Sequence, residues 1–189
     1  TALWTGDNVT YEGAYYRFEN LTIDPKPVQK PHPPIWIGGG TQPSEKIYAQ
    51  TVNNIDPVLR RIAKYAKTWV PHSSSTAEMV RGDWEKIQRF MGEFGRTPSD
   101  MTRVYSNFVY VLRKGERPEA AVPHFSVYSG MDLPYWKEFY LVGEAEEVAE
   151  KIRGKIAALG GVEHVVLNPL HWGMDQLERL AAEVLPRVA

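Results

Sequence analysis

The sequence predicts an α/β fold in which parallel β-strands alternate with α-helices. Short runs rich in β-branched and aromatic residues recur along the chain, and each is followed by a stretch whose apolar residues have helical spacing. Glycines and prolines separate these segments. Strands that alternate with helices in this way are joined by crossover connections, which make neighbouring strands parallel.

The composition is that of a globular domain with a sizeable core. The 189 residues are 43% hydrophobic and 24% charged, and the formal net charge of −1 offers no electrostatic attraction for nucleic acid. The chain has no cysteine, which excludes disulfides, zinc–thiolate sites and cysteine nucleophiles. No apolar run approaches the roughly 18–20 residues of a membrane span, so we expect no membrane partner and a cytoplasmic location.

Residues 1–34 carry turn chemistry rather than the strand–helix pattern. Turn signals at Asp7-Asn8 and Glu12-Gly13 flank short β-prone runs, which predicts a β-hairpin. Five prolines between residues 25 and 34 then favour an extended path.

The first strand–helix unit contains the most informative turn of the chain. A strand over residues 35–37 stops at three glycines, Gly38, Gly39 and Gly40, and a helix is expected over residues 44–51. A glycine turn between a strand and a helix leaves backbone N–H groups free, where they can hold a phosphate. The alternative is a tight turn needed only for chain reversal.

Three further units follow. Asp56 is expected to cap a helix that has Pro57 at its first position, and a short strand follows at residues 68–70. Thr76 is expected to cap a long helix that ends at Gly95. The remaining expected segments are a strand at 101–112, an irregular stretch at 113–140, a helix at 144–159, a strand at 162–167 that is broken by Asn168-Pro169, and a final helix at 174–188.

Four strand–helix units leave several architectures open. A closed (β/α)₈ barrel needs eight units and roughly 250 residues, so four units amount to half of one. The alternatives are a small open four-stranded sheet and half-barrels that associate with one another.

A resemblance to a known family favours the barrel. The residues that carry it are Val9-x-Tyr11-x-Gly13-x-Tyr15-Tyr16-x-Phe18, then Pro25-x-Pro27-x-Gln29-x-Pro31-x-Pro33-Pro34-Ile35-Trp36-Ile37-Gly38-Gly39, and later Leu141 to Ala149. This pattern resembles the bacterial-luciferase-like monooxygenases, which are flavin- or deazaflavin (F420)-dependent oxidoreductases with a TIM-barrel fold.

The resemblance implies a place for the chain within such a barrel. It corresponds to a single domain over residues 1–189, with a hairpin and loop lead-in at 1–34 and the fifth to eighth βα units at 35–189. The first four strands are not part of this match. Because the resemblance places the catalytic residues on them, none is assigned here.

The resemblance also implies site residues at the carboxyl ends of the strands, where TIM barrels bind their ligands. The flavin phosphate is expected on Gly38, Gly39, Gly40, Thr41 and Gln42. His72, Asn168 and His171 are the substrate-side candidates. Each has a plainer interpretation: His72 as a surface loop residue, Asn168 as a turn residue before proline, and His171 as a residue packed beside Trp172.

The long segment after the third strand holds His124 and several aromatic residues, and it is expected to act as a lid or to plug the open barrel interior. No metal site is predicted, because the five histidines are scattered and no His-Glu-x-x-His motif occurs.

The implied cofactor is FMN, with F420 as the alternative, and NAD(P)H is the implied reductant. The implied partners are a small organic substrate and O₂. A non-catalytic half-barrel is the competing hypothesis. Since half a barrel has two unpaired strand edges, we expect the chain to form a homo-oligomer or to pair with a missing N-terminal half.

Overall fold

The computed structural model describes residues 1–43, 54–128, 130–171 and 173–188. The helix expected over residues 44–51, with Ser44 at its start, lies outside the described residues. The described chain divides into two compact units, Thr1–Ile35 and Trp36–Ala189, and each is treated by itself.

The first unit contains the expected hairpin. After the short helix α1 (Ala2–Thr5), strands β1 (Val9–Glu12) and β2 (Arg17–Leu21) pair in antiparallel fashion. Tyr11 lies opposite Phe18, and their rings stack at 5.6 Å between centroids. The turn signals at residues 7–8 and 12–13 therefore predicted this element correctly.

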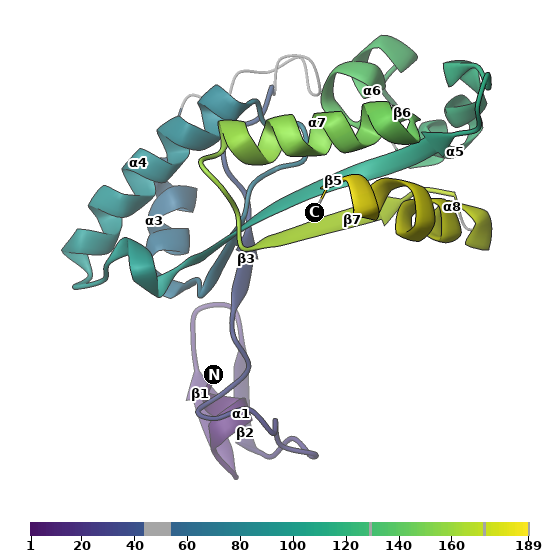
Figure 1. The fold of residues 1–189 in the computed structure, drawn as a ribbon. Coiled ribbons are helices and arrows are strands. Elements are labelled where there is room, and N and C mark those ends of the chain that lie inside the picture. Colours follow the sequence, from purple (N-terminus) through teal and green to yellow (C-terminus); the bar gives the residue numbers. More distant parts are fainter. Residues whose placement is uncertain (44–53, 129, 172, 189) are drawn as a thin grey trace. The chain divides into compact units, whose positions relative to one another are not determined.

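The second unit is built on a parallel five-stranded sheet, which confirms the α/β class (Figure 1). Its strands are β3 (Trp36–Gly38), β4 (Thr68–Val70), β5 (Thr102–Leu112), β6 (Leu141–Glu144) and β7 (His164–Pro169). The order is β3-β4-β5-β6, and β7 pairs with β5. Every pairing in this sheet is parallel.

The long strand β5 organises the sheet, because three strands pair with different parts of it. Strand β4 pairs with its first two residues, β7 with residues 104–109, and β6 with residues 109–112. Val109 lies opposite both Leu141 and Pro169, so β6 and β7 flank opposite edges of β5.

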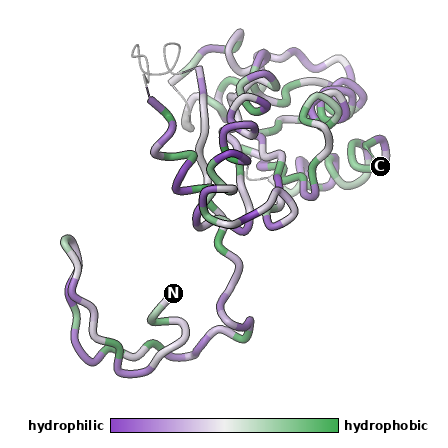
Figure 2. The backbone as a smooth tube through the Cα atoms, turned by 90° about the vertical axis from the view of Figure 1, so that its left-hand side faces the viewer, coloured by the Kyte–Doolittle hydropathy of each residue, from purple (hydrophilic) through white to green (hydrophobic). Residues whose placement is uncertain are grey.

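Helices cover the sheet and create three apolar cores. Helices α3 (Asp56–Tyr65) and α4 (Ala77–Glu93) pack around Trp69, and α7 (Ala145–Ala158) packs on β5 through Val148 and Ile152. In Figure 2, hydrophobic and hydrophilic residues follow one another along the coiled parts of the second unit. The C-terminal helix runs without a break through α8 (Met174–Arg179), the π-helical turn η3 (Leu180–Val184) and α9 (Leu185–Val188).

The segment expected to be irregular, 113–140, is largely helical, and that expectation was wrong. It contains the 3₁₀ turn η2 (Pro118–Ala121), α5 (Val122–Tyr128) and α6 (Leu133–Phe139), and it forms the third core around Phe125 and Trp136. Another 3₁₀ turn, η1 (Pro98–Asp100), precedes β5. Helices this short give a weak periodic signal, and only the aromatic core that they share stabilises them.

Two strand boundaries also differ from expectation. Residues 141–144, for which no strand was expected, form strand β6, because the end of β5 extends beyond β4 and offers them a partner. Asn168-Pro169, expected to break the last strand, belongs to β7, which ends at Pro169. Proline is tolerated at that position because the strand ends there and no further ladder bond is required.

Two buried carboxamides complete the hydrogen bonding of β5 where no strand flanks it. The Asn107 side chain accepts from the Phe108 N–H at 2.8 Å and donates to the Phe139 carbonyl at 2.9 Å. The Gln176 side chain accepts from the Val111 N–H at 2.8 Å and donates to its carbonyl at 3.1 Å. Each carboxamide thus replaces a missing strand, because an unpaired buried backbone group is costly.

In the part of the chain that the structure describes, no helix is long and apolar enough to cross a membrane.

We predict that Gln176→Leu lowers the free energy of unfolding by about 2–4 kcal/mol, because the Val111 N–H and carbonyl become buried without partners. Urea unfolding followed by circular dichroism measures this. The control, Glu178→Leu, places the same side chain at an exposed position of α8 and is expected to change stability by no more than about 0.5 kcal/mol. Equal losses in both variants would contradict the role of Gln176.

Candidate functional site

The glycine turn at the end of β3 is held in an unusual backbone conformation. Gly39 and Gly40 have φ angles of +137° and +139°, which side chains other than glycine rarely allow. The Gly39 N–H donates to the Val70 carbonyl at 3.1 Å, and the Trp69 indole N–H donates to the Gly39 carbonyl at 2.7 Å. The turn is therefore fixed to the end of the neighbouring strand, β4.

A buried carboxylate on α4 binds the end of the turn. The Thr41 N–H donates to Oδ2 of Asp83 at 2.6 Å, and the Thr41 hydroxyl donates to Oδ1 at 2.6 Å. A Cβ atom on Gly40 would lie only 2.7 Å from Oδ2, so Gly40 makes room for the carboxylate. The Thr41 carbonyl accepts from the Ser75 hydroxyl at 2.5 Å.

The donor set of this turn fits an oxyanion such as a phosphate. Two donors of Thr41 converge on the two oxygens of one carboxylate, which is the arrangement that a phosphate group would also use. The side-chain oxygen of Gln42 is buried without a hydrogen-bond partner among the described residues. Two convergent donors, which Asp83 accepts, and a polar group without a partner among the described residues thus lie at the turn that the sequence singled out.

The loop after β4 lies beside the turn and carries His72. Because Ser75 in this loop bonds Thr41, the structure brings the two predicted groups together. Nδ1 of His72 accepts from the Ser74 N–H at 3.2 Å, and burial lowers the pKa of His72, which favours its neutral form. The Tyr135 hydroxyl of α6 lies 2.6 Å from the Ser74 hydroxyl, so the segment 113–140 contacts this loop.

Asn168 and His171 lie in a different place. Following the register from strand to strand, Gly38 is level with Val104 and His164. Asn168 is four residues beyond His164, which is about 13 Å along the strand. Its carboxamide lies 3.4 Å from the Ser106 hydroxyl and from the Asn107 carbonyl, contacts that hold β7 to β5.

His171 belongs to a cluster that the sequence did not reveal. Its Nδ1 lies 3.2 Å from Oδ1 of Asp175, and its ring meets that of His124 at 4.4 Å. The ring of Tyr110 stacks on His124 at 5.2 Å. Burial, and then the nearby His171, lower the pKa of His124. This cluster joins α5 to the end of β7, and no three His, Asp or Glu side chains of the described residues form a metal site.

Asp83 is the site residue that the sequence analysis missed. A signal for it existed, since a charged residue stands between Val80 and Ile87 on the apolar face of a predicted helix. A buried charge on such a face requires hydrogen-bonding partners, which Thr41 supplies.

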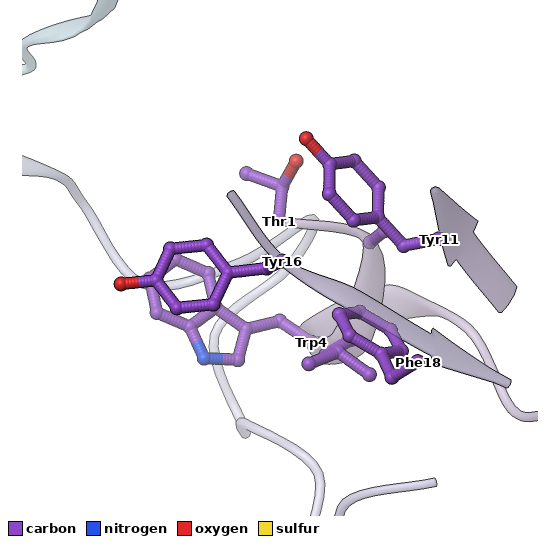
Figure 3. A pocket seen from close by; sticks show the side chains of 7 residues that line it. Thr1, Trp4, Tyr11, Tyr16 and Phe18 are labelled. Carbon is purple, nitrogen blue, oxygen red and sulfur yellow. The ribbon is translucent and has the colours of Figure 1, made fainter. Parts of the chain in front are cut away.

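An aromatic-lined pocket in the first unit was also not predicted (Figure 3). It has a volume of about 390 Å³ and is lined by α1 and the hairpin, with Trp4, Tyr11, Tyr16 and Phe18 around it. Tyr16 is 75% exposed, so the pocket is open at the surface of the hairpin.

We predict that Gly40→Ala destabilises the protein by about 1–3 kcal/mol, because the new methyl group meets a strained φ angle and the Asp83 carboxylate. The control is Gly82→Ala on α4, where a Cβ atom meets nothing within 4 Å. Helix propensity should make that variant more stable by about 0.5–1 kcal/mol. Thermal unfolding compares the stabilities of the two variants. An unchanged stability of Gly40→Ala would contradict the predicted strain.

Two curated relatives match nearly the whole of this chain. FMNH₂-dependent dimethylsulfone monooxygenase from Pseudomonas putida is 48% identical over 202 residues, which cover 98% of this chain and 54% of the relative. The enzyme of the same name from Pseudomonas fluorescens (strain Pf0-1) is 23% identical over 98% of this chain. The chain spans about half the length of the curated relatives it matches.

Solved structures show the same fold. An F420-dependent secondary alcohol dehydrogenase in complex with an F420-acetone adduct matches with a TM-score of 0.68 at 17% identity, over 100% of this chain and 58% of the other. The oxygenating constituent of 3,6-diketocamphane monooxygenase from Pseudomonas putida, in complex with FMN, matches with a TM-score of 0.64 at 18% identity, over 98% and 60%.

These matches confirm a partial TIM barrel, the fold expected from the sequence. The sequence profile described as luciferase-like monooxygenase matches residues 1–136, which is well over half of the chain. The chain belongs to the luciferase-like monooxygenase family.

Proposed function

We propose that this chain is the carboxyl-side half of an FMNH₂-dependent monooxygenase that oxidises a small organic sulfone with O₂. The observation that carries the proposal is the 48% identity to dimethylsulfone monooxygenase along 98% of the chain. The matched region covers nearly all of the chain, from the hairpin unit to the C-terminal helix.

In this proposal the glycine turn anchors the cofactor. The N–H groups of Gly40, Thr41 and Gln42 and the Thr41 hydroxyl hold the flavin phosphate, whereas Gly38 and Gly39 shape the turn, since the Gly39 N–H already donates to the Val70 carbonyl. His72 lies on the adjoining loop, which Ser75 joins to Thr41. Reduced FMN, when bound, supplies the electrons for oxidation by O₂. The chain itself binds, orients and shields the cofactor, and Asn168 and His171 lie farther along the strands on the substrate side.

FMN is favoured over F420 for a specific reason. Two F420-dependent neighbours are 17% and 15% identical to this chain and support only the fold, whereas the relative with 48% identity is named for FMNH₂. We propose NAD(P)H as the source of the reducing electrons and the cytoplasm as the location of the protein. The catalytic residues are proposed to lie in the part of the relatives that this chain does not match.

The sheet also favours a partner that completes the barrel. Within the described residues, β3 pairs only with β4 and β7 only with β5, so each presents an open edge. Trp36 on β3 and Val165 on β7 are 48% and 37% exposed. We propose that the N-terminal half or a second copy of the chain covers these edges. A non-catalytic half-barrel is the alternative if neither arrangement gives turnover.

We predict that FMN binds more tightly than riboflavin, because only FMN carries the phosphate, and that Thr41→Val lowers the affinity for FMN about tenfold by removing one charge-assisted donor. Titration calorimetry measures both. Ser126→Ala, an exposed hydroxyl on α5, is the control and should leave both affinities unchanged. Equal affinity for the two flavins would refute the proposed phosphate anchor.

We further predict that the 21.5 kDa chain self-associates in solution, because its open strand edges bury themselves against a second copy. Sedimentation velocity measures the mass. A monomer at every accessible concentration would contradict this prediction and favour a separate N-terminal half as the partner.

A further inference from the structure

Asp83 is a buried carboxylate at the proposed phosphate turn. Its side chain is only 3% exposed, and its two oxygens accept the N–H and the hydroxyl of Thr41 at 2.6 Å each. No ion pair among the described residues includes Asp83. The negative charge is therefore satisfied, within the part of the chain that the structure describes, by the donors of the turn.

Three hydrogen bonds hold the turn without involving Asp83. The Gly39 N–H is held by the Val70 carbonyl, the Gly39 carbonyl by the Trp69 indole, and the Thr41 carbonyl by the Ser75 hydroxyl. These three hydrogen bonds come from β4 and the loop that follows it. Asp83 thus adds two hydrogen bonds to a turn that β4 and its following loop already hold.

A phosphate bound by the same donors would meet this carboxylate. Two anions cannot share two donors at hydrogen-bonding distance, because their repulsion in a buried site is poorly screened. A Cβ atom on Gly40 would lie only 2.7 Å from Oδ2 of Asp83, so the carboxylate fills the space beside the turn. The carboxylate therefore occupies the position of an oxyanion ligand.

We propose that Asp83 is an internal competitor for the anion site and sets its affinity for phosphate: the carboxylate binds the two donors of Thr41 when no phosphate is present, and it must withdraw when a flavin phosphate binds. This inference rests on the proposed function, in which the glycine turn binds the phosphate. Asp83 is thereby a specificity-determining residue, because it weakens the binding of phosphate-bearing flavin and leaves riboflavin unaffected.

The test is the variant Asp83→Asn, which keeps the shape of the side chain and removes its charge. We expect its affinity for FMN to rise about tenfold relative to the unmodified chain, while its affinity for riboflavin is unchanged. The matched control is Glu85→Gln, which removes one negative charge from an exposed position of the same helix. Its affinity for FMN should change less than about twofold, because exposed charges are screened.

A flavin-free readout tests the same contact. Inorganic phosphate is titrated into the ¹⁵N-labelled protein, and the Thr41 amide signal is followed by NMR. We expect this signal to shift at a phosphate concentration about tenfold lower in Asp83→Asn than in the unmodified chain. Circular dichroism verifies folding, and Asp83→Ser provides a second uncharged variant should the first be unfolded.

The outcomes separate the inference from the function on which it rests. If the unmodified chain binds FMN and Asp83→Asn binds it equally well or more weakly, the competition is refuted and the proposed function stands. If no form prefers FMN to riboflavin, the proposed phosphate anchor fails. The phosphate titration then decides the inference by itself, and equal Thr41 shifts in both forms overturn it.

Discussion

The fold depends on hydrogen-bond partners for the backbone N–H and carbonyl groups of strand β5 along both of its edges. β5 is 11 residues long, whereas its neighbours have three to six, so no single neighbour can cover it. β4, β6 and β7 each pair with a part of it, and the carboxamides of Asn107 and Gln176 fill two of the places between them. The three apolar cores form where helices from the connections between these strands pack on β4, β5 and β6.

The candidate site also depends on hydrogen-bond partners for its buried polar groups. The glycine turn exists because Gly39 and Gly40 adopt backbone conformations that bring Thr41 against α4. A carboxylate can be buried there only because two donors meet it, and those donors suit a phosphate for the same reason. The family assignment and the 48% identity to a flavin-dependent monooxygenase give this local chemistry a proposed purpose.

The predicted site residues form two groups that lie at different places in the second unit. The turn and the His72 loop are joined by the Ser75–Thr41 hydrogen bond at the end of β4, whereas His171 lies with His124 and Asp175 at the far end of β5. A flavin is an elongated ligand, so a phosphate anchor and a substrate region separated along the strands are compatible with one site. The segment 113–140, expected to act as a lid or to plug the open barrel interior, forms an aromatic core with β5 and β6, and α6 contacts the His72 loop through Tyr135.

The sequence by itself determined the α/β class, the hairpin, the glycine turn, most helix boundaries and the family, because these depend on local periodicity, turn residues and a contiguous motif. It left β6, α5 and α6 undetected, since four to seven residues carry little periodic signal and are stabilised by partners distant in the sequence. Only the tertiary structure decided that Asp83 binds Thr41, 42 residues away, and that His171 meets His124. Such contacts arise from the packing of whole elements, and neither spacing nor composition encodes which side chains that packing brings together.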